Sequence, residues 1–327
     1  MTHKGAILVA GGAGFIGAQT CKALAQAGYL PVTLDNLSTG YGAAVRWGPF
    51  YQGDIRDRDL VLKIASDHQI VGALHFAAYS LVGESVRDPA KYYDNNVGAG
   101  TAFASSLVEA GVKALVFSST AAVYGTPDRS PILETATTVP INPYGASKLA
   151  FESALYWLGQ AHDLRWTVLR YFNAAGADPD GEVGESHVPE THLIPLLCKA
   201  ALGTGPGLTV FGQDYDTPDG TPIRDYIHVV DLAAAHVLAI ARLIEGGDSQ
   251  IFNVGTGEGA TVMQMITAAQ KLGLSVPYTV GPRRAGDPPS LVADSTKLKA
   301  MTGWKPVCSD LETLIRDAVR WQKNPLY

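Results

Sequence analysis

Cysteine is scarce in this chain of 327 residues, which contains only three. Cys21, Cys198 and Cys308 lie far apart, and none belongs to a Cys-x-x-Cys pair. An odd number of separated cysteines argues against both a disulfide framework and a zinc site. His187 and His192 are five residues apart and miss the four-residue spacing of a helical metal pair. The sequence therefore predicts no metal site, and it favours a reducing compartment, the cytoplasm.

Long apolar runs and basic runs are missing as well. No apolar stretch reaches the ~20 residues that a membrane span requires, and the run at 6–10 is too short for the core of a signal peptide. The formal net charge is −6 without any Lys/Arg-rich run, whereas nucleic-acid binders normally carry a basic surface. Neither a Gly-x-Ser-x-Gly elbow nor a Walker phosphate loop occurs. We therefore expect a protein that binds neither membranes nor nucleic acid.

Short apolar runs alternate with helical patterns in the first half of the chain. Strands are expected at 6–10, 31–34, 71–76, 114–118 and 166–171. Helices are expected near 15–27, 57–67, 91–110 and 144–160. Strand–helix–strand repetition with continuous apolar strands is typical of a parallel sheet covered by helices on both faces. The pattern therefore predicts an α/β fold with a doubly wound parallel sheet of the Rossmann type.

Three glycines, Gly11, Gly14 and Gly17, follow the first expected strand and open the first expected helix. In a dinucleotide-binding loop the first permits a tight turn, the second lets the backbone approach a pyrophosphate, and the third lets helix and strand pack. Asp35 closes the second strand, where a carboxylate accepts both ribose hydroxyls of NAD and repels the 2′-phosphate of NADP. A glycine-rich turn followed by a surface acid is the alternative, but it leaves the register of strand, loop, helix and acid unexplained. The segment predicts NAD binding.

The pattern becomes less regular after Asn173. Loops rich in Gly, Pro and acidic residues are expected at 178–189 and 213–222, followed by short strands and helices near 229–243 and 261–271. We therefore expect an NAD-binding Rossmann domain at 1–172, to which segments near 229–255 return. A smaller, mixed α/β part at 173–327 is expected to bind the substrate.

Tyr144 and Lys148 are four residues apart and share one face of an expected helix. A free tyrosine has a pKa near ~10 and is a poor base at neutral pH, but a lysine ammonium and the positive nicotinamide ring of NAD⁺ both favour the phenolate. Ser118, Ser119 and Thr120 end a strand, where active groups of open α/β sheets gather. An incidental Tyr/Lys pair is the alternative, and the glycine loop favours the functional interpretation, in which the pair accepts a proton from a sugar hydroxyl.

Several motifs follow one another in order along almost the whole chain, to Trp304. They are GGAGFIG (11–17), LDN (34–36), GDI (53–55), YYDNNV (92–97), SSTAAVYG (118–125), PYGASK (143–148), RYFN (170–173) and RDYIHV (224–229). With them the chain resembles the extended short-chain dehydrogenase/reductase superfamily and, within it, the UDP-glucose 4-epimerases (UDP-galactose 4-epimerases). Nucleotide-sugar 4,6-dehydratases of this superfamily carry acidic residues just after the Ser/Thr motif, where this chain has Ala121 and Ala122. Alanine has no proton to give for an elimination, which argues against a dehydratase.

The resemblance implies an NAD-dependent interconversion of UDP-galactose and UDP-glucose. Tyr144, assisted by Lys148 and Thr120, would remove the 4′-hydroxyl proton while the C4 hydride passes to NAD⁺. The 4-keto sugar would then turn over in the pocket and be reduced on its other face, so that NAD stays tightly bound. Alternatives are a 4-epimerase of UDP-N-acetylhexosamines, UDP-pentoses or UDP-uronic acids, a reductase, and a catalytically silent NAD-binding protein. A silent protein would have no need of all three side chains.

The resemblance also assigns residues to each ligand. Those expected at the cofactor are Gly11, Gly14, Phe15, Ile16, Gly17, Asp35, Asn36, Asp54, Ile55, Phe76, Ala77, Ser80, Asn95, Lys148 and Tyr171. Those expected at the UDP-hexose are Thr120, Tyr144, Asn173, His192, Leu193, Phe211, Arg224, Arg284, Asp287 and Leu291. The two arginines are expected at the diphosphate, the aspartate at the uridine ribose and the phenylalanine at the uracil. A homodimer through the helices near 91–110 and 144–160 is implied as well.

Four positions depart from the family pattern. Ala10 replaces a threonine, Ser80 stands where many members have a lysine near NAD, and His192 replaces an asparagine found in some. Leu291 occupies the position whose bulk limits the C2 substituent of the sugar, where a large aromatic residue excludes an N-acetyl group and a small residue admits it. Leucine is intermediate, so the acceptance of UDP-N-acetylhexosamines is left open.

Overall fold

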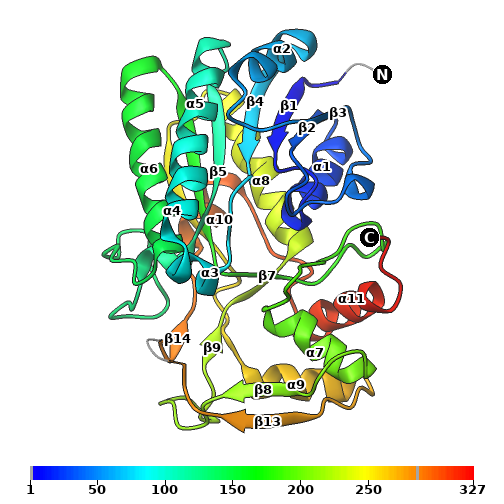
Figure 1. Cartoon of the computed structure of the whole chain (residues 1–327). Coiled ribbons are helices and arrows are strands. Elements are labelled where there is room, and N and C mark those ends of the chain that lie inside the picture. The colour runs from blue at the N-terminus through cyan, green and yellow to red at the C-terminus, as the bar shows by residue number, and fades with distance from the viewer. Residues whose placement is uncertain (1–2, 285–286) are drawn as a thin grey trace.

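Seven parallel strands form the main sheet of the computed structural model, which describes residues 3–284 and 287–327 (Figure 1). Their order across the sheet is β11-β6-β5-β4-β1-β2-β3. The strands are β1 (Ala6–Ala10), β2 (Leu30–Asp35), β3 (Phe50–Gln52), β4 (Ile70–His75), β5 (Ala114–Thr120), β6 (Arg165–Tyr171) and β11 (Gln250–Val254). The chain winds outward in both directions from β1, which confirms the predicted doubly wound parallel sheet.

Helices cover both faces of this sheet. On one face lie α1 (Phe15–Gln26) and α8 (Val229–Ile244), and on the other lie α2 (Arg58–His68), α5 (Gly100–Glu109) and α6 (Pro143–His162) (Figure 1). Along β1, Ile7 and Val9 pack toward the first face while Leu8 packs toward the second, and all three are fully buried. Burial on both faces explains why the strand is continuously apolar rather than alternating.

The helix expected near 91–110 is built in three pieces. α4 (Pro89–Tyr92) starts after the capping side chain of Asp88, a π-helical turn η2 follows at Tyr93–Ala99, and α5 continues to Glu109. A π-turn inserts an extra residue and is frequently found at functional sites. Here it carries Asn95 and Asn96 to the edge of the sheet where the strands end.

A smaller part of mixed α/β structure lies below the main sheet in Figure 1. Helices α7 (Leu193–Leu202), α9 (Val262–Lys271) and α11 (Leu311–Lys323) share one apolar core. The short strands are β7 (Asn173–Ala175) beside β10 (Tyr226–His228), β8 (Leu208–Phe211) beside β13 (Tyr278–Gly281), and β9 (Ile223–Arg224) between β12 (Ala260–Thr261) and β14 (Ser290–Leu291). Since β11 and α8 belong to the main sheet, the chain passes more than once between its two parts. The domain boundaries themselves stay a prediction.

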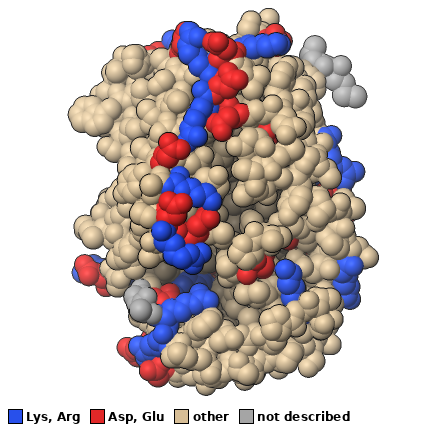
Figure 2. All heavy atoms as spheres, in the orientation of Figure 1, with Lys and Arg blue, Asp and Glu red and all other residues tan. Residues whose placement is uncertain are grey.

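The structure allows the apolar helices and the surface charges of the molecule to be located. Among the described residues, no helix combines the length and the apolar character needed to cross a membrane. On the face seen in Figure 2, Lys and Arg side chains alternate with Asp and Glu in a band rather than forming one basic patch. The smaller part carries further basic side chains at the lower edge of this view.

Candidate active site

An open cleft with about 570 Å³ of empty space lies where β1, β2 and β4 end. From the set predicted to bind the cofactor, it is lined by Gly11, Gly14, Asp35, Asn36, Asp54, Ile55, Phe76, Ala77 and Asn95. The sequence analysis did not assign to the cofactor the further lining residues Leu34, Ser38, Thr39, Gly40, Gly53, Ala78 and Tyr79. Leu34 and Gly53 belong to quoted motifs, and the others follow the expected strands at 31–34 and 71–76, which was the signal that could have found them. A glycine turn and a carboxylate at the ends of parallel strands, here Gly11, Gly14 and Asp35, are features of a dinucleotide-binding site.

The glycine loop at the cleft is shaped by close backbone approaches. Gly11 has φ +81°, and a Cβ there would lie 2.6 Å from the backbone nitrogen of Ala77. A Cβ on Gly17 would lie 2.1 Å from the carbonyl oxygen of Gly11. Gly14 is different, because a Cβ would meet nothing nearer than 3.5 Å, and the residue begins α1 without a capping side chain. The free N–H groups at this helix end and the bare backbone therefore fit a pyrophosphate.

Asp35 ends β2 at the same cleft and is almost fully buried. One carboxylate oxygen accepts a hydrogen bond from the Ala13 amide at 2.9 Å, and the other accepts one from the Leu37 amide at 2.8 Å. Burial raises the pKa of this carboxyl, and the two amide donors act against that shift. Each oxygen retains a lone pair, so the carboxylate can receive two ribose hydroxyls.

Replacing Asp35 by asparagine is expected to weaken NADH binding by about 10- to 100-fold, because hydrogen bonds to a charged group contribute about 1.5–3 kcal/mol. Binding of NADPH should fall far less, because the charge that repels the 2′-phosphate is gone. Titration of cofactor-stripped protein with NADH and NADPH, followed by fluorescence, gives both constants. Asp59→Asn, on the exposed start of α2, is the matched control. An unchanged ratio of the two constants in Asp35→Asn would contradict this role.

The three residues predicted to be catalytic meet at the end of β5. Thr120 is the last residue of β5 and is buried, and Tyr144 lies half-buried in the first turn of α6. That helix begins at Pro143, and the side chain of Asn142 caps it by accepting a hydrogen bond from the Gly145 amide at 2.8 Å. Burial raises the pKa of the Tyr144 phenol, and the neighbouring Thr120 hydroxyl opposes the shift.

Lys148 follows one helical turn later and is buried beneath the tyrosine. Its Nζ donates to the carbonyl oxygen of Ser118 at 2.9 Å and lies 6.0 Å from the centre of the Tyr144 ring. Burial lowers the pKa of the Lys148 ammonium to about 7, with the Glu152 carboxylate acting in the opposite direction. The lysine is thus held close to the phenol by a strand carbonyl.

A buried ionic network, which sequence reasoning missed, joins helix α6 to strand β6. Glu152 lies one turn after Lys148 and pairs with Arg170 of β6, both with side chains at most 5% exposed. Ser119 donates to the same carboxylate at 2.5 Å, and Arg170 also donates to the Tyr124 hydroxyl at 3.0 Å. Because these residues are far apart in sequence, no local spacing links them.

A second residue that sequence reasoning missed is Asn96 in the π-turn, which bonds both to the loop after β4 and to helix α6. Its Oδ1 accepts from the Tyr79 amide at 2.9 Å, and its Nδ2 donates to the Tyr79 carbonyl at 3.0 Å and to Ser147 Oγ at 3.1 Å. Tyr79 lines the cleft, and Ser147 precedes Lys148 on α6. Asn96 therefore ties the cleft wall to α6.

Five residues predicted to bind the substrate gather in the smaller part. Arg224 forms an ion pair with Asp287, and the Arg284 guanidinium carbon lies 4.1 Å from the centre of the Phe211 ring. Leu291 is the partner of Arg224 in the β14–β9 pairing. Hydrogen bonds to Asp287 and to a backbone carbonyl occupy only part of the Arg224 guanidinium, which retains N–H donors for an anion.

The remaining predicted residues are more dispersed. Asn173 begins β7 and donates to the carbonyl oxygen of Asp225, next to Arg224. Tyr171 ends β6, and its hydroxyl lies 2.7 Å from Ser118 Oγ, close to the residues predicted to be catalytic. Other predicted residues lie outside the cleft lining, namely Phe15, Ile16 and Gly17 on α1 and Ser80 on an exposed loop. His192 and Leu193 stand where α7 begins, and the His192 side chain faces Glu185 and Glu190. The ligand roles of all these residues stay predictions.

Known proteins share this architecture closely. Residues 7–255 match the NAD dependent epimerase/dehydratase family. A UDP-glucose 4-epimerase of Lacticaseibacillus casei is 49% identical over 320 residues, 97% of each chain. The crystal structure of a UDP-glucose 4-epimerase from Brucella ovis in complex with NAD superposes with a TM-score of 0.95 at 50% identity, covering 97% of this chain and 98% of that one. One from Bifidobacterium longum, in complex with NAD⁺ and UDP, has a TM-score of 0.91 at 37% identity, covering 98% and 99%. The chain therefore belongs to the NAD dependent epimerase/dehydratase family, as a homologue of its UDP-glucose 4-epimerases.

Proposed function

We propose that this chain interconverts UDP-galactose and UDP-glucose with NAD as a tightly held cofactor. The observation that carries the proposal is the meeting of Thr120, Tyr144 and Lys148 beside the cleft that fits NAD. When bound, NAD supplies the reversible acceptance of a hydride from C4 of the sugar. The homologues named UDP-glucose 4-epimerase, at 46–50% identity over nearly the whole chain, support the same reaction.

Tyr144 is the residue that accepts and returns the proton of the 4′-hydroxyl in this proposal. Burial raises the pKa of its phenol, so the phenolate needs stabilising neighbours. The Thr120 hydroxyl and the Lys148 ammonium provide them, since a hydrogen bond and a nearby positive charge both favour an anion. Tyr144 acts in both directions because the proton it accepts in the oxidative half is the proton it returns in the reductive half.

The substrate diphosphate is expected at Arg224 and Arg284. Arginine binds phosphate well because its planar fork stays charged and offers paired donors. Arg284 also lies over the face of Phe211, so ring and cation form one wall on which a uracil can stack. Anchoring through UDP leaves the hexose itself free to turn, which inversion at C4 requires. The presence of UDP in the Bifidobacterium longum structure supports this ligand class.

The experiment is to incubate the purified chain with UDP-galactose, without added NAD, and to resolve the nucleotide sugars over time. We expect UDP-glucose to appear, and the same equilibrium mixture to be reached from either sugar. Conversion without added NAD supports a cofactor that stays bound to the protein. If no conversion occurs even with NAD added, the proposal fails, and the same assay with UDP-N-acetylglucosamine, UDP-pentoses and UDP-uronic acids tests the alternatives.

We also propose that two copies pair through the helices α5 and α6. These helices lie side by side on one face of the sheet (Figure 1), and α6 exposes Tyr156 and Trp157 to solvent at 46% and 66%. Large exposed aromatic side chains are typical of interaction surfaces. Sedimentation velocity is expected to give the mass of two chains.

The three cysteines are free, which supports a reducing compartment, the cytoplasm.

A further inference from the structure

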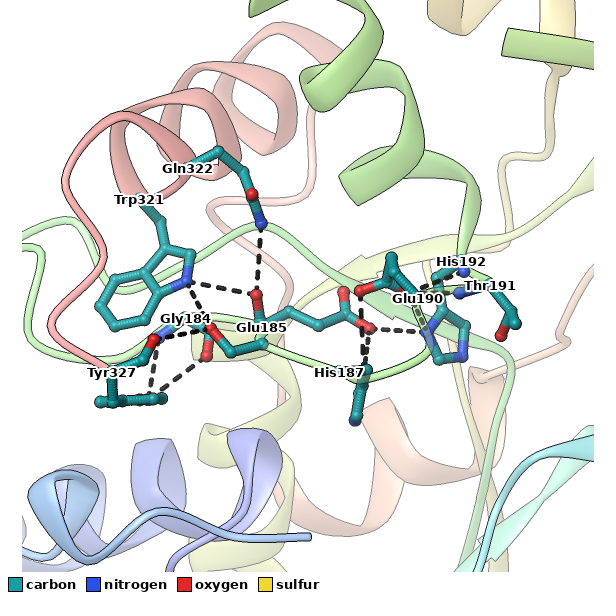
Figure 3. Close-up of polar contacts among 10 residues, drawn as sticks. Gly184, Glu185, His187, Glu190, Thr191, His192, Trp321, Gln322 and Tyr327 are labelled. Carbon is teal, nitrogen blue, oxygen red and sulfur yellow. Dashed lines mark hydrogen bonds and ion pairs between the residues drawn. The ribbon is translucent and has the colours of Figure 1, made fainter. Parts of the chain in front are cut away.

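Two histidines and two glutamates face one another on the loop that leads into α7 (Figure 3). Glu185, His187, Glu190 and His192 each offer one ligand atom, and these four atoms all lie within 4.8 Å of one another. The glutamate side chains are buried, at 5% and 4% exposed, while the histidines are partly exposed. None of the four has a part in the proposed chemistry, although His192 was predicted to contact the substrate.

Four nitrogen–oxygen distances within this cluster, which involve both carboxylate oxygens of Glu190, bracket the edge length of a tetrahedral zinc site. His187 Nδ1 lies 3.0 Å from Glu185 Oε1 and 3.9 Å from Glu190 Oε2. His192 Nδ1 lies 2.7 Å from Glu185 Oε1 and 3.1 Å from Glu190 Oε1. A zinc ion with ligands at about 2.1 Å has tetrahedral edges of about 3.4 Å. Small side-chain movements would therefore place all four atoms around one ion.

Glu190 supplies an independent observation. Its Oε1 accepts from the amides of Thr191 and His192, whereas Oε2 is buried and has no hydrogen-bond partner among the described residues. This oxygen is the one that faces His187. A buried carboxylate oxygen without a donor is costly, and a metal ion at the centre of the cluster would satisfy it.

The backbone around the cluster is held in place from α11 (Figure 3). Trp321 Nε1 and Gln322 Nε2 both donate to the carbonyl oxygen of Glu185, at 3.2 and 3.3 Å. These two hydrogen bonds fix the backbone from which the Glu185 side chain reaches the cluster.

A second group of acidic side chains differs from this cluster because a lysine already lies among its carboxylates. Asp178, Asp180 and Glu182 also bring their carboxylates together, but the Lys22 ammonium lies among them at 2.7–2.9 Å from each. A lysine in this position already neutralises the carboxylates. In the cluster before α7, by contrast, no Lys or Arg of residues 3–284 and 287–327 pairs with the two carboxylates, whose partners are imidazoles that can themselves bind a metal.

We propose that Glu185, His187, Glu190 and His192 bind one divalent transition-metal ion of the Zn²⁺ class. Two imidazoles with two carboxylates suit zinc, whereas Ca²⁺ and Mg²⁺ prefer oxygen ligands alone. The sequence predicts no metal here because the five-residue spacing of the histidines misses the period of a helix. The loop brings them together by its own folding instead, with ring centres 5.3 Å apart. The ion would fasten the loop to the start of α7.

The test is titration of the chelator-treated, cofactor-containing protein with ZnCl₂ against a chromophoric competing chelator. One equivalent is expected to bind, and Co²⁺ in its place should give the intense visible bands of a tetrahedral site. His187→Ala is expected to weaken binding by more than about 100-fold, since even outer partners of a metal site are worth 10- to 100-fold. His162→Ala, at the exposed end of α6, is the control that keeps full binding.

Glu190→Gln preserves shape and serves if His187→Ala does not fold, as judged by circular dichroism. It should lose the Co²⁺ bands, and Zn²⁺ should raise the melting temperature of the wild type but not of this variant. Binding of less than one equivalent by the wild type, or equal binding by the wild type and a folded variant, would overturn the proposal. Because no substrate is present, this result is independent of whether the epimerase assay succeeds.

Discussion

Tyr144→Phe is expected to lower turnover of UDP-galactose by about 10²- to 10⁴-fold, the usual contribution of a general acid or base. The change removes one hydroxyl and keeps the ring, so the half-buried site on α6 should repack without strain. The KM for the UDP-sugar should change little, because binding depends on groups elsewhere such as Arg224. Initial rates over a range of substrate concentrations, with circular dichroism as the check on folding, measure both quantities.

Tyr278→Phe is the matched control for this prediction. Tyr278 lies on β13 of the smaller part with its side chain exposed, so the turnover of this variant should equal that of the wild type. Turnover of Tyr144→Phe within about threefold of the wild type would rule out the phenol as the proton acceptor.

Glu152→Ala is expected to lower the free energy of unfolding by about 3–5 kcal/mol, because it leaves the Arg170 guanidinium buried without its counter-charge. The variant also loses the hydrogen bond from Ser119 and the carboxylate whose charge opposes the lowering of the Lys148 pKa by burial. Urea unfolding, followed at equal NAD saturation for all proteins, measures the difference.

The control for the buried pair is a pair on the surface. Glu109→Ala breaks the exposed contact with Arg58 and should lower the free energy of unfolding far less than Glu152→Ala, because water screens an exposed pair. The double variant Glu152→Ala with Arg170→Met should recover part of the loss, since no charge then remains buried. Equal stability of Glu152→Ala and Glu109→Ala would contradict the importance assigned to the network.

Residues that act locally were predictable from the sequence, and those that act across the fold were not. The run at 6–10 is apolar throughout, and the run at 114–118 is apolar as far as Phe117, because both faces of the sheet are covered, so their patterns were unambiguous. β3 was missed because it has three residues at the sheet edge and two of them are exposed. Tyr144 and Lys148 were found because one helical turn separates them.

The contacts of Glu152 with Arg170 and of Asn96 with Tyr79 depend instead on which elements become neighbours. No spacing rule contains that information, since 18 and 17 residues respectively separate the partners. The same holds for the cluster around Glu185. There the helical spacing rule was applied to a loop, and it pointed away from the arrangement that the fold produces.

The placement of β11 has a consequence for dissecting the protein. This strand comes from the second half of the chain and forms the outer edge beside β6, while α8 covers the sheet face next to it. A fragment ending at residue 172 would leave the hydrogen-bonding groups of β6 open and a large apolar surface bare, conditions that favour aggregation. The main sheet is therefore completed by residues from both halves of the chain, and its N-terminal part cannot be exchanged between relatives as a separate unit.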